Sequence, residues 1–239
     1  MKIKQVYKWL FNNQQLPCLL CQASGPHAEH GLCTGCHADL PWLGYHCRQC
    51  AIPLPQPDAR CGQCQQRAPA FSQVVCPLLY RFPLDSLIPA FKHHEQLTYG
   101  RLLGRLLAEH VQHHYHERQL QLPDLLVPMP LFRGRLAQRG FNQAHELARP
   151  VARLLQLPLS QRSLQRIRPT PAQQGLSARE RRRNLQDAFS CSAPEHMLGR
   201  HVALIDDVLT TGASADEASR VLLAAGALSV SVWCVARTP

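Results

Sequence analysis

Two adjacent carboxylates follow a short apolar run in the segment VALIDDVLTTGAS, residues 202–214. The run Val202–Ile205 has the composition of a buried strand, and Asp206 and Asp207 come directly after it. Two like charges at the rim of a sheet repel each other unless a cation, a ligand or open water takes up the charge. We therefore expect a binding site where this strand ends.

A loop of small and hydroxyl-bearing residues follows the acidic pair: Thr210, Thr211, Gly212, Ala213 and Ser214. A helix is predicted to begin at Ser214, with a capping box formed by Ser214 and Glu217. An oxyanion at that helix start meets free N–H groups and the positive end of the helix dipole. The loop is neither a P-loop, because no Gly-Lys-Ser/Thr follows, nor a dinucleotide fingerprint, because it has one glycine. An acidic pair beside a phosphate cradle predicts a ligand that offers hydroxyls next to a phosphate, such as a ribose 5-phosphate.

Eight of the eleven cysteines form four Cys-x-x-Cys pairs separated by 11, 10 and 10 residues: Cys18/Cys21, Cys33/Cys36, Cys47/Cys50 and Cys61/Cys64. A redox role needs a single such motif opening a helix in a βαβ unit, which four repeats in a proline-rich stretch do not resemble. A tetrahedral structural zinc takes four thiolates, so eight cysteines predict two closed Zn²⁺ sites. Grouping the first pair with the second and the third with the fourth is simplest, and an interleaved grouping is the alternative that the sequence leaves open.

The net charge of +10 is concentrated in one block. Between Arg133 and Arg183 there are 12 arginines and 2 glutamates (12 − 2 = +10), and the rest of the chain holds 14 basic and 14 acidic residues. The planar fork of arginine suits phosphate oxygens. The run RERRR at 179–183, taken alone, fits a solvated helix face as well. The block as a whole predicts polyanionic partners.

Regular elements that would position these residues begin after the cysteine-rich stretch, which shows no sustained periodicity. We expect strands near 74–82, 125–129, 159–166, 201–206 and 228–235, and helices near 84–93, 98–117, 142–156, 177–185 and 214–225. Such alternation predicts an α/β fold with a mainly parallel sheet flanked by helices. Ligands of such sheets bind at the carboxyl ends of the strands, where the acidic pair would lie.

The segment 202–214 resembles the phosphoribosyl pyrophosphate (PRPP) signature of type I phosphoribosyltransferases. In that family the acidic pair binds the ribose 2- and 3-hydroxyls, directly or through Mg²⁺, and the following loop holds the 5-phosphate. The resemblance implies that Asp206 and Asp207 are the catalytic pair and that Thr210 to Ser214 bind the phosphate of PRPP.

Two further stretches, VPMPLFRGRLAQRGFNQAHELA at 127–148 and RPTPAQQGLSARERRRNLQDAF at 168–189, resemble blocks of the ComF/GntX family. That family joins a double zinc ribbon to a type I phosphoribosyltransferase domain, which implies a zinc-ribbon domain over residues 1–68 and a phosphoribosyltransferase-like domain over 69–239. By position, Arg133 and Arg139 resemble the pyrophosphate loop of those enzymes. The segment around Arg166, Arg168, Thr170 and Gln174 lies where they carry a flexible lid.

The resemblance implies displacement of pyrophosphate from PRPP by a nitrogen acceptor, assisted by Mg²⁺ and arginine, and a role in DNA uptake, DNA utilisation or nucleoside metabolism. No base-recognition pocket can be identified in residues 74–117, so the acceptor is not predicted. The alternative is a non-enzymatic protein that handles single-stranded DNA and uses the phosphate site for sensing or for strand binding. Only Phe132 and Phe141 are aromatic in and beside the arginine block, which is few for base stacking.

The N-terminus and the apolar tracts predict a cytoplasmic protein. Lys8 interrupts a stretch too short for a signal-peptide core. The longest apolar tract, Val221–Ala236, includes Gly226 and is shorter than the roughly 20 residues of a membrane span. We expect no membrane span, and we expect PRPP, single-stranded DNA and DNA-uptake proteins as partners.

Overall fold

The computed structural model describes residues 17–24, 31–93, 96–169 and 185–239. The chain divides into two compact units, Met1–Leu40 and Pro41–Pro239. The first two cysteine pairs belong to the smaller unit, and the other two belong to the larger one. The domain boundary expected between residues 68 and 69 remains a prediction, since sequence motifs and compact units need not share their limits.

The smaller unit contains two cysteine turns and one short helix, α2 (Thr34–Ala38). The amide of Leu19 donates to the carbonyl of Gly31 at 2.9 Å and joins the two turns. Among its described residues, the buried apolar side chains are few: Cys18, Leu32 and Leu40. A unit with so small a core needs a further source of stability, such as a bound metal.

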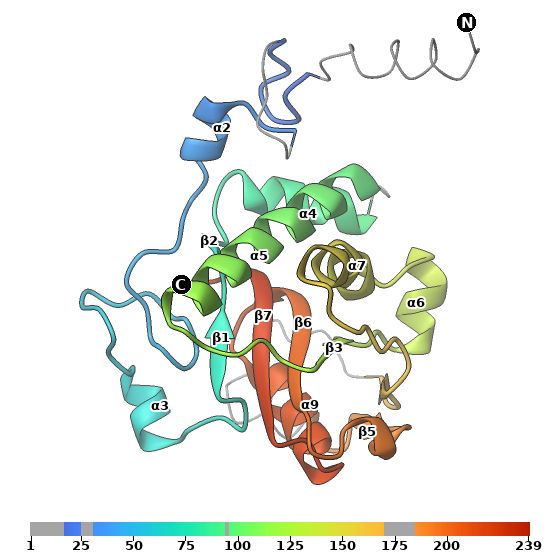
Figure 1. Ribbon diagram of the computed structural model, residues 1–239. Helices are drawn as coiled ribbons and strands as arrows, with labels where there is room; N and C mark the ends of the chain where they lie inside the picture. The colour runs from blue at the N-terminus through green and yellow to red at the C-terminus, as the bar shows by residue number, and fades with distance from the viewer. Residues whose placement is uncertain (1–16, 25–30, 94–95, 170–184) are drawn as a thin grey trace, which may run out of the picture. The chain divides into compact units, whose positions relative to one another are not determined.

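A five-stranded sheet, in which every pairing is parallel, forms the centre of the larger unit (Figure 1). Its order is β1 (Gln73–Val75), β7 (Ser229–Arg237), β6 (His201–Leu209) and β3 (Leu125–Pro128). β2 (Leu78–Leu79) also pairs with β7, closer to the carboxyl end of β7 than β1 does. β6 and β7 are buried along most of their length, as their nearly continuous apolar sequences indicate for strands covered on both faces. The expected mainly parallel sheet is confirmed.

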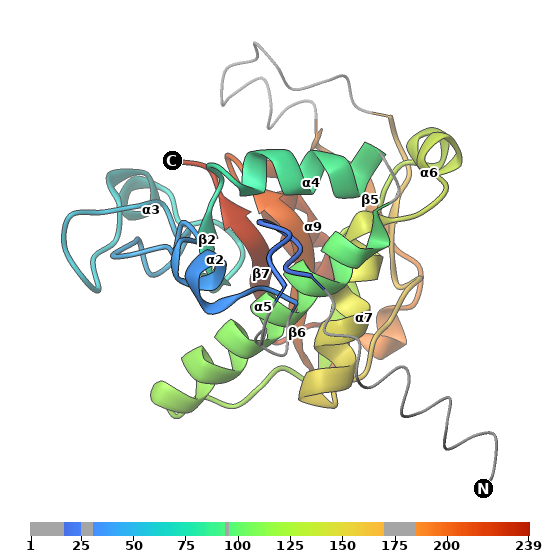
Figure 2. The same cartoon turned by 90° about the horizontal axis from the view of Figure 1, so that it is seen from above.

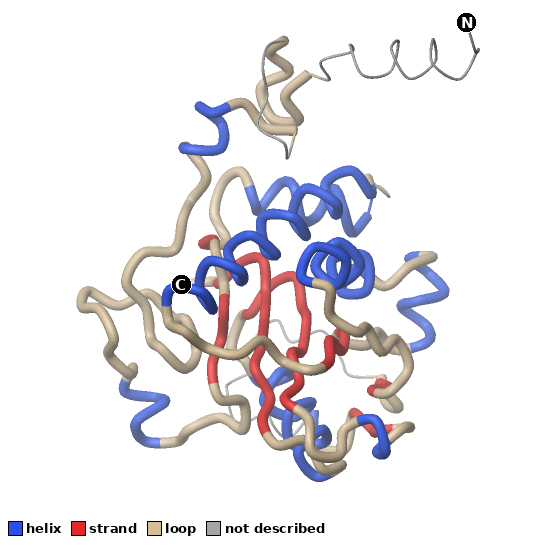
Figure 3. Tube along the Cα trace, in the orientation of Figure 1, coloured by secondary structure: helices blue, strands red, loops and turns tan. Residues whose placement is uncertain are grey.

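Helices flank this sheet (Figures 2 and 3). α5 (Leu97–Glu117) and α7 (Gln143–Leu155) pack against each other, α5 contacts β7, and α7 contacts β6 and β3. α4 (Leu84–His93) packs on α5. α9 (Ala213–Ala224) contacts β6 and β7 as well. The layered α/β arrangement expected from the alternation of elements is therefore present.

Successive side chains of β7 separate the two layers of helices. Val232 belongs to the core that includes Ala218 and Leu222 of α9. The next residue, Trp233, is fully buried and lies edge-on to Tyr115 of α5, with ring centroids 5.6 Å apart. Because alternate residues of a strand point to opposite faces, α9 covers one face of the sheet and α5 covers the other.

The remaining elements are peripheral: α3 (Gly62–Gln66), α6 (Arg133–Arg139), the antiparallel pair β4 (Leu164–Arg166) and β5 (Phe189–Cys191), and the 3₁₀ turn η1 (Pro194–His196). α6 and β5 were not expected from the sequence. Their segments are short and rich in polar residues, so neither shows a clear apolar period. The helix expected near 177–185 lies almost wholly outside the described residues.

Several details of the expected elements differ. The strand expected near 159–166 is only β4, which pairs with β5 outside the main sheet. The strand expected near 74–82 is divided into β1 and β2. β6 continues to Leu209 because its last two residues pair with Ala236 and Arg237 of β7. The capping box is wrong, because α9 begins at Ala213 with Gly212 as its N-cap. In the described part of the chain, no helix has the length and apolar character needed to cross a bilayer.

Candidate functional site

Each cysteine group has the geometry of a closed zinc site. In both groups the four Sγ atoms all lie within 4.8 Å of one another: Cys18, Cys21, Cys33 and Cys36 in one, and Cys47, Cys50, Cys61 and Cys64 in the other. The Sγ–Sγ distance is 3.8 Å for Cys21 and Cys33 and 3.6 Å for Cys50 and Cys61. A tetrahedron with Zn–S bonds of about 2.3 Å places its sulfurs about 3.8 Å apart. The residues therefore fit structural Zn²⁺, and the structure shows the sequential grouping.

Backbone amides also point at these sulfurs. The amide of Cys33 donates to Cys18 Sγ at 3.3 Å, and the amide of Cys61 donates to Cys47 Sγ at 3.3 Å. N–H donors of this kind stabilise thiolate ligands in the same way that outer hydrogen bonds support other metal ligands. The first and the second group have equivalent contacts, which indicates the same kind of site in both.

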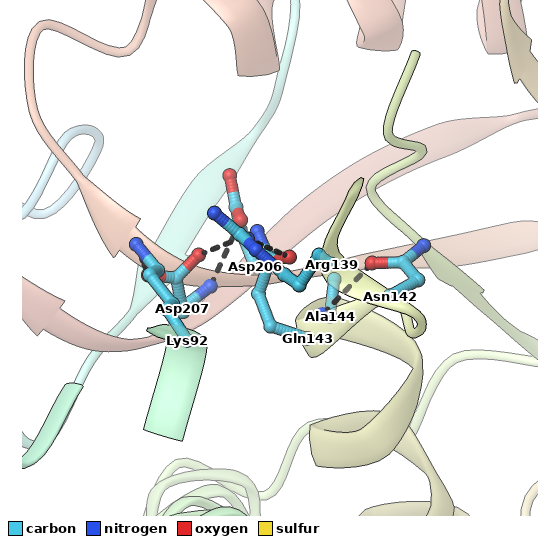
Figure 4. A network of polar contacts seen from close by, with 7 residues as sticks. All are labelled: Lys92, Arg139, Asn142, Gln143, Ala144, Asp206 and Asp207. Atoms are coloured by element: carbon cyan, nitrogen blue, oxygen red, sulfur yellow. Dashed lines mark hydrogen bonds and ion pairs between the residues drawn. The ribbon is translucent and has the colours of Figure 1, made fainter. Parts of the chain in front are cut away.

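The acidic pair lies near the carboxyl end of β6, within a polar network shown in Figure 4. The side chain of Asp207 is nearly buried and forms an ion pair with Lys92 Nζ of α4. Gln143 Nε2, at the start of α7, donates to Asp207 Oδ1 at 3.3 Å. Asp206 Oδ1 accepts from the amide of Asp207 at 2.9 Å. The carboxylate of Asp207 is thus fixed in place by groups from two helices.

Asp206 is the less compensated of the two carboxylates. Burial, and then the neighbouring charge of Asp207, raise the pKa of Asp206 well above its ordinary value, and the hydrogen bond from the Asp207 amide and the charge of Lys92 oppose this only in part. A raised carboxyl pKa means that the neutral form is favoured until a positively charged group comes close. A cation beside Asp206 would favour the ionised form of its carboxyl group.

Two of the predicted arginines, Arg139 and Arg166, interact electrostatically with this acidic pair. Arg139, the last residue of α6, donates from Nη1 to Gln143 Oε1 at 2.6 Å. Burial lowers the pKa of Arg139, and the charge of Asp207 opposes that shift. Arg166 of β4 lies over the ring of Phe189, 5.6 Å from its centroid. Burial and Arg135 lower the pKa of Arg166, and Asp206 opposes this shift, so both arginines lie within electrostatic reach of the acidic pair.

The other predicted arginines occupy more peripheral positions. Arg133 is an exposed residue at the start of α6. Arg168 is exposed and donates to the carbonyl of Gln186. Their roles toward pyrophosphate remain predictions. Thr170, Gln174 and the run at 179–183 lie outside the described residues.

The predicted phosphate loop connects β6 to α9. Thr210 and Thr211 are exposed, Ala213 and Ser214 are half-buried, and the amide of Ala213 donates to Thr211 Oγ1 at 3.5 Å. Gly212 has a φ of 76°, a left-handed value that glycine adopts without strain. The loop thus has the sharp turn into a helix N-terminus that an oxyanion site requires.

A cavity of about 660 Å³ lies against this loop. Its lining comes from the loop itself, from residues of the second cysteine group and the segment after it, and from the C-terminal end of β7: Cys50, Ile52, Gln63, Cys64, Gln66, Arg67, Ala68, Pro69, Phe71, Thr210, Thr211, Gly212, Ala213, Asp216, Arg237, Thr238 and Pro239. The acidic pair is not among these residues. The loop, which follows the acidic pair in the sequence, therefore contributes to the wall of the cavity, whereas the acidic pair does not.

Sequence reasoning missed two residues of the site, Lys92 and Gln143. Lys92 lies in the last turn of α4, where a lone lysine carries no motif. Gln143 follows Asn142, whose side chain accepts from the amide of Ala144 at 3.0 Å and so caps α7. Recognising Asn142 as an N-cap would have placed Gln143 at the helix start, but not beside Asp207.

Comparison with known proteins identifies the family. A family model for the double zinc ribbon domain matches residues 6–77. Competence protein F of Haemophilus influenzae is 36% identical over 221 residues, which cover 92% of this chain and 96% of the relative. The chain belongs to the ComF family. Another relative, DNA utilization protein YhgH of Escherichia coli K12, is 37% identical over 221 residues with the same coverage of both chains.

Solved structures add a more distant likeness. Glutamine PRPP amidotransferase from B. subtilis is 18% identical to this ComF family member, with a TM-score of 0.35. The match covers 54% of this chain and 24% of that one. The N-terminal double zinc ribbon, followed by a mainly parallel sheet flanked by helices, agrees with the sequence-based expectation.

Proposed function

We propose that this ComF family member binds PRPP with Mg²⁺ at the carboxyl end of β6 and transfers its phosphoribosyl group to a nitrogen acceptor. The observation that carries the proposal is the acidic pair, in which Asp207 is fixed by Lys92 and Gln143 while Asp206 remains short of positive charge. The loop at the start of α9 begins at Thr210, three residues after Asp207. A ribose 5-phosphate offers both hydroxyls and a phosphate.

The roles of the side chains follow from their surroundings. Asp206 and Asp207 would hold the ribose hydroxyls and Mg²⁺, which when bound neutralises charge on the pyrophosphate. Amides of Gly212 and Ala213 would receive the 5-phosphate. In the reaction the bond between C1 and the pyrophosphate oxygen breaks and a bond from C1 to the acceptor nitrogen forms. Arg139 and Arg166, with Arg133 and Arg168, would stabilise the negative charge that develops on the leaving group.

Binding of two ligands, PRPP and ribose 5-phosphate, tests the pyrophosphate half and the ribose-phosphate half of the site separately. Calorimetry with Mg²⁺ should show that Arg139→Met lowers affinity for PRPP by roughly 10- to 100-fold, since charge-assisted hydrogen bonds contribute about 1.5–3 kcal/mol. Affinity for ribose 5-phosphate should stay unchanged, and Arg153→Met, an exposed position on α7, is the matched control. An equal loss for both ligands would contradict the assignment of Arg139. Pyrophosphate release in the presence of candidate nitrogen acceptors then tests turnover.

Contact with single-stranded DNA is the second candidate. The names of the relatives refer to competence and DNA utilization, and the excess charge of this chain lies in one arginine block. Each phosphate contact contributes about −0.7 to the slope of log affinity against log salt for a single strand. Replacing Arg181, Arg182 and Arg183 by alanine should therefore reduce the slope by about 2. Binding that does not change with salt would exclude a role of the arginine block in holding DNA.

We also place the protein in the cytoplasm. Eight paired thiols remain available as zinc ligands in a reducing compartment, whereas an oxidising one favours disulfides. Fractionation of cells that express the native chain tests this placement, and recovery outside the cytoplasmic fraction would contradict it.

A further inference from the structure

The second cysteine group, Cys47 to Cys64, is built into the same compact unit as the sheet. The amide of Leu43 donates to the carbonyl of Pro77 at 2.8 Å, and the amide of Leu79 donates to that of Pro41 at 2.7 Å. Ala51, between the two cysteine pairs, is fully buried in the core that contains Leu209. The group is therefore anchored on the edge of the sheet.

One buried side chain connects this group to the phosphate loop. Arg237, the last residue of β7, is 5% exposed. Its Nε donates to the carbonyl of Cys50 at 2.9 Å, and its Nη1 donates to the carbonyls of Thr210 at 2.6 Å and Leu209 at 3.2 Å. A guanidinium presents its donors in a rigid fork, so the positions of Cys50 and of the loop become coupled.

A second link runs through residues 70 and 71. Gln49, next to Cys50 and 7% exposed, donates from Nε2 to the carbonyl of Phe71 at 3.3 Å. The ring of Phe71 lies 3.7 Å from the position of a Cβ at Gly212. The amide of Ala70 donates to Asp216 Oδ1, in the first turn of α9, at 2.7 Å. The loop is thus held from the side of the cysteine group at both of its ends.

We propose that the second zinc site is the structural support of the phosphate loop, and that Arg237 is the positioning residue that transmits this support. With Zn²⁺ bound, Cys47, Cys50, Cys61 and Cys64 would fix the turn that carries the Cys50 carbonyl, and Arg237 joins that carbonyl to the carbonyl of Thr210. The first cysteine group, Cys18 to Cys36, belongs to the other compact unit. Our proposal assigns this support to the second group alone. The two halves of the double zinc ribbon therefore have different tasks. The identity of the ligand that the loop binds rests on the proposed function, whereas the support of the loop by the second zinc site does not.

Hydrogen exchange of the full chain, read by mass spectrometry, tests the support without any ligand. Arg237→Met should increase exchange in the first turn of α9, residues 213–216, by about tenfold or more, since hydrogen bonds to a charged group contribute about 1.5–3 kcal/mol. Its zinc content should stay at two ions per chain. Cys61→Ser should lose one zinc and show the same local increase. Cys33→Ser, the matched control, should also lose one zinc but leave this turn unchanged.

Gln49→Ala keeps every cysteine and decides the matter if Cys61→Ser fails to fold. It should raise exchange in the same turn while β3 and β6 stay protected. Equal exchange in wild type, Arg237→Met and Gln49→Ala would overturn the proposal, as would an increase in Cys33→Ser equal to that in Cys61→Ser. Calorimetry with PRPP and Mg²⁺ adds a separate result. Failure of the wild type to bind would contradict the proposed function, whereas the exchange pattern would still decide the role of the second zinc site.

Discussion

Replacing Lys92 by methionine tests the charge balance on which the acidic site depends. The side chain of Asp207 is 5% exposed, and Lys92 is the cation that forms its ion pair. Removing one partner of a buried pair costs about 3–5 kcal/mol. The side chain of Lys92 is itself 23% exposed and Gln143 continues to donate, so we expect the low end, about 3 kcal/mol. In a unit of roughly 200 residues this corresponds to a fall in Tm of about 6–12 °C.

Thermal unfolding followed by circular dichroism at pH 7 measures this fall. Arg101→Met, at an exposed position of α5, is the matched control and should change stability by less than about 0.5 kcal/mol. Mg²⁺ should stabilise Lys92→Met more than it stabilises the wild type, because the variant leaves the acidic pair with one cation fewer. A Tm no lower than that of Arg101→Met, or an equal response to Mg²⁺, would refute the view that Lys92 neutralises Asp207.

Three further predictions concern pH and the loop. The pKa of Asp206 is raised in the folded state, so its ionisation opposes folding, and Asp206→Asn should raise the Tm at pH 7, with the gain shrinking toward about pH 4 in a pH series of melts. Burial, the largest cause for both groups, lowers the pKa of His110 and His114 to about 4, so stability should fall as the pH drops from about 6.5 toward 4, and a double replacement by glutamine should flatten that decline. Gly212→Ala should cost about 1–2 kcal/mol in denaturant unfolding because alanine is strained at a φ of 76°, and a cost no larger than that of Gly35→Ala, a glycine without a positive φ, would argue against this conformation.

The acidic strand and its loop were predictable because their signals are local. An apolar run, two carboxylates and a glycine turn occupy 13 consecutive residues, and the strand and helix they predict are present. The position at which β6 ends was less predictable, because Val208 and Leu209 belong to the strand only through their pairing with β7. The capping box was wrong for a related reason. Gly212 makes the turn, so Ser214 already lies inside the helix.

Contacts between distant elements could not be read from the sequence. Lys92 and Gln143 meet Asp207 because α4 and α7 lie beside the end of β6, and no local pattern encodes that approach. Arg237 looks like the polar end of an apolar strand, yet its side chain is buried and joins Cys50 to Thr210. The grouping of the cysteines also required the fold, because spacings of 11, 10 and 10 residues are nearly uniform.

Titration of PRPP into the protein in the presence of Mg²⁺ tests the central claim most directly. The wild type should bind, and the double variant Asp206→Asn/Asp207→Asn should lose binding while its zinc content stays at two ions per chain. Equal binding by the wild type and the double variant would show that the acidic pair is not the site of the ligand.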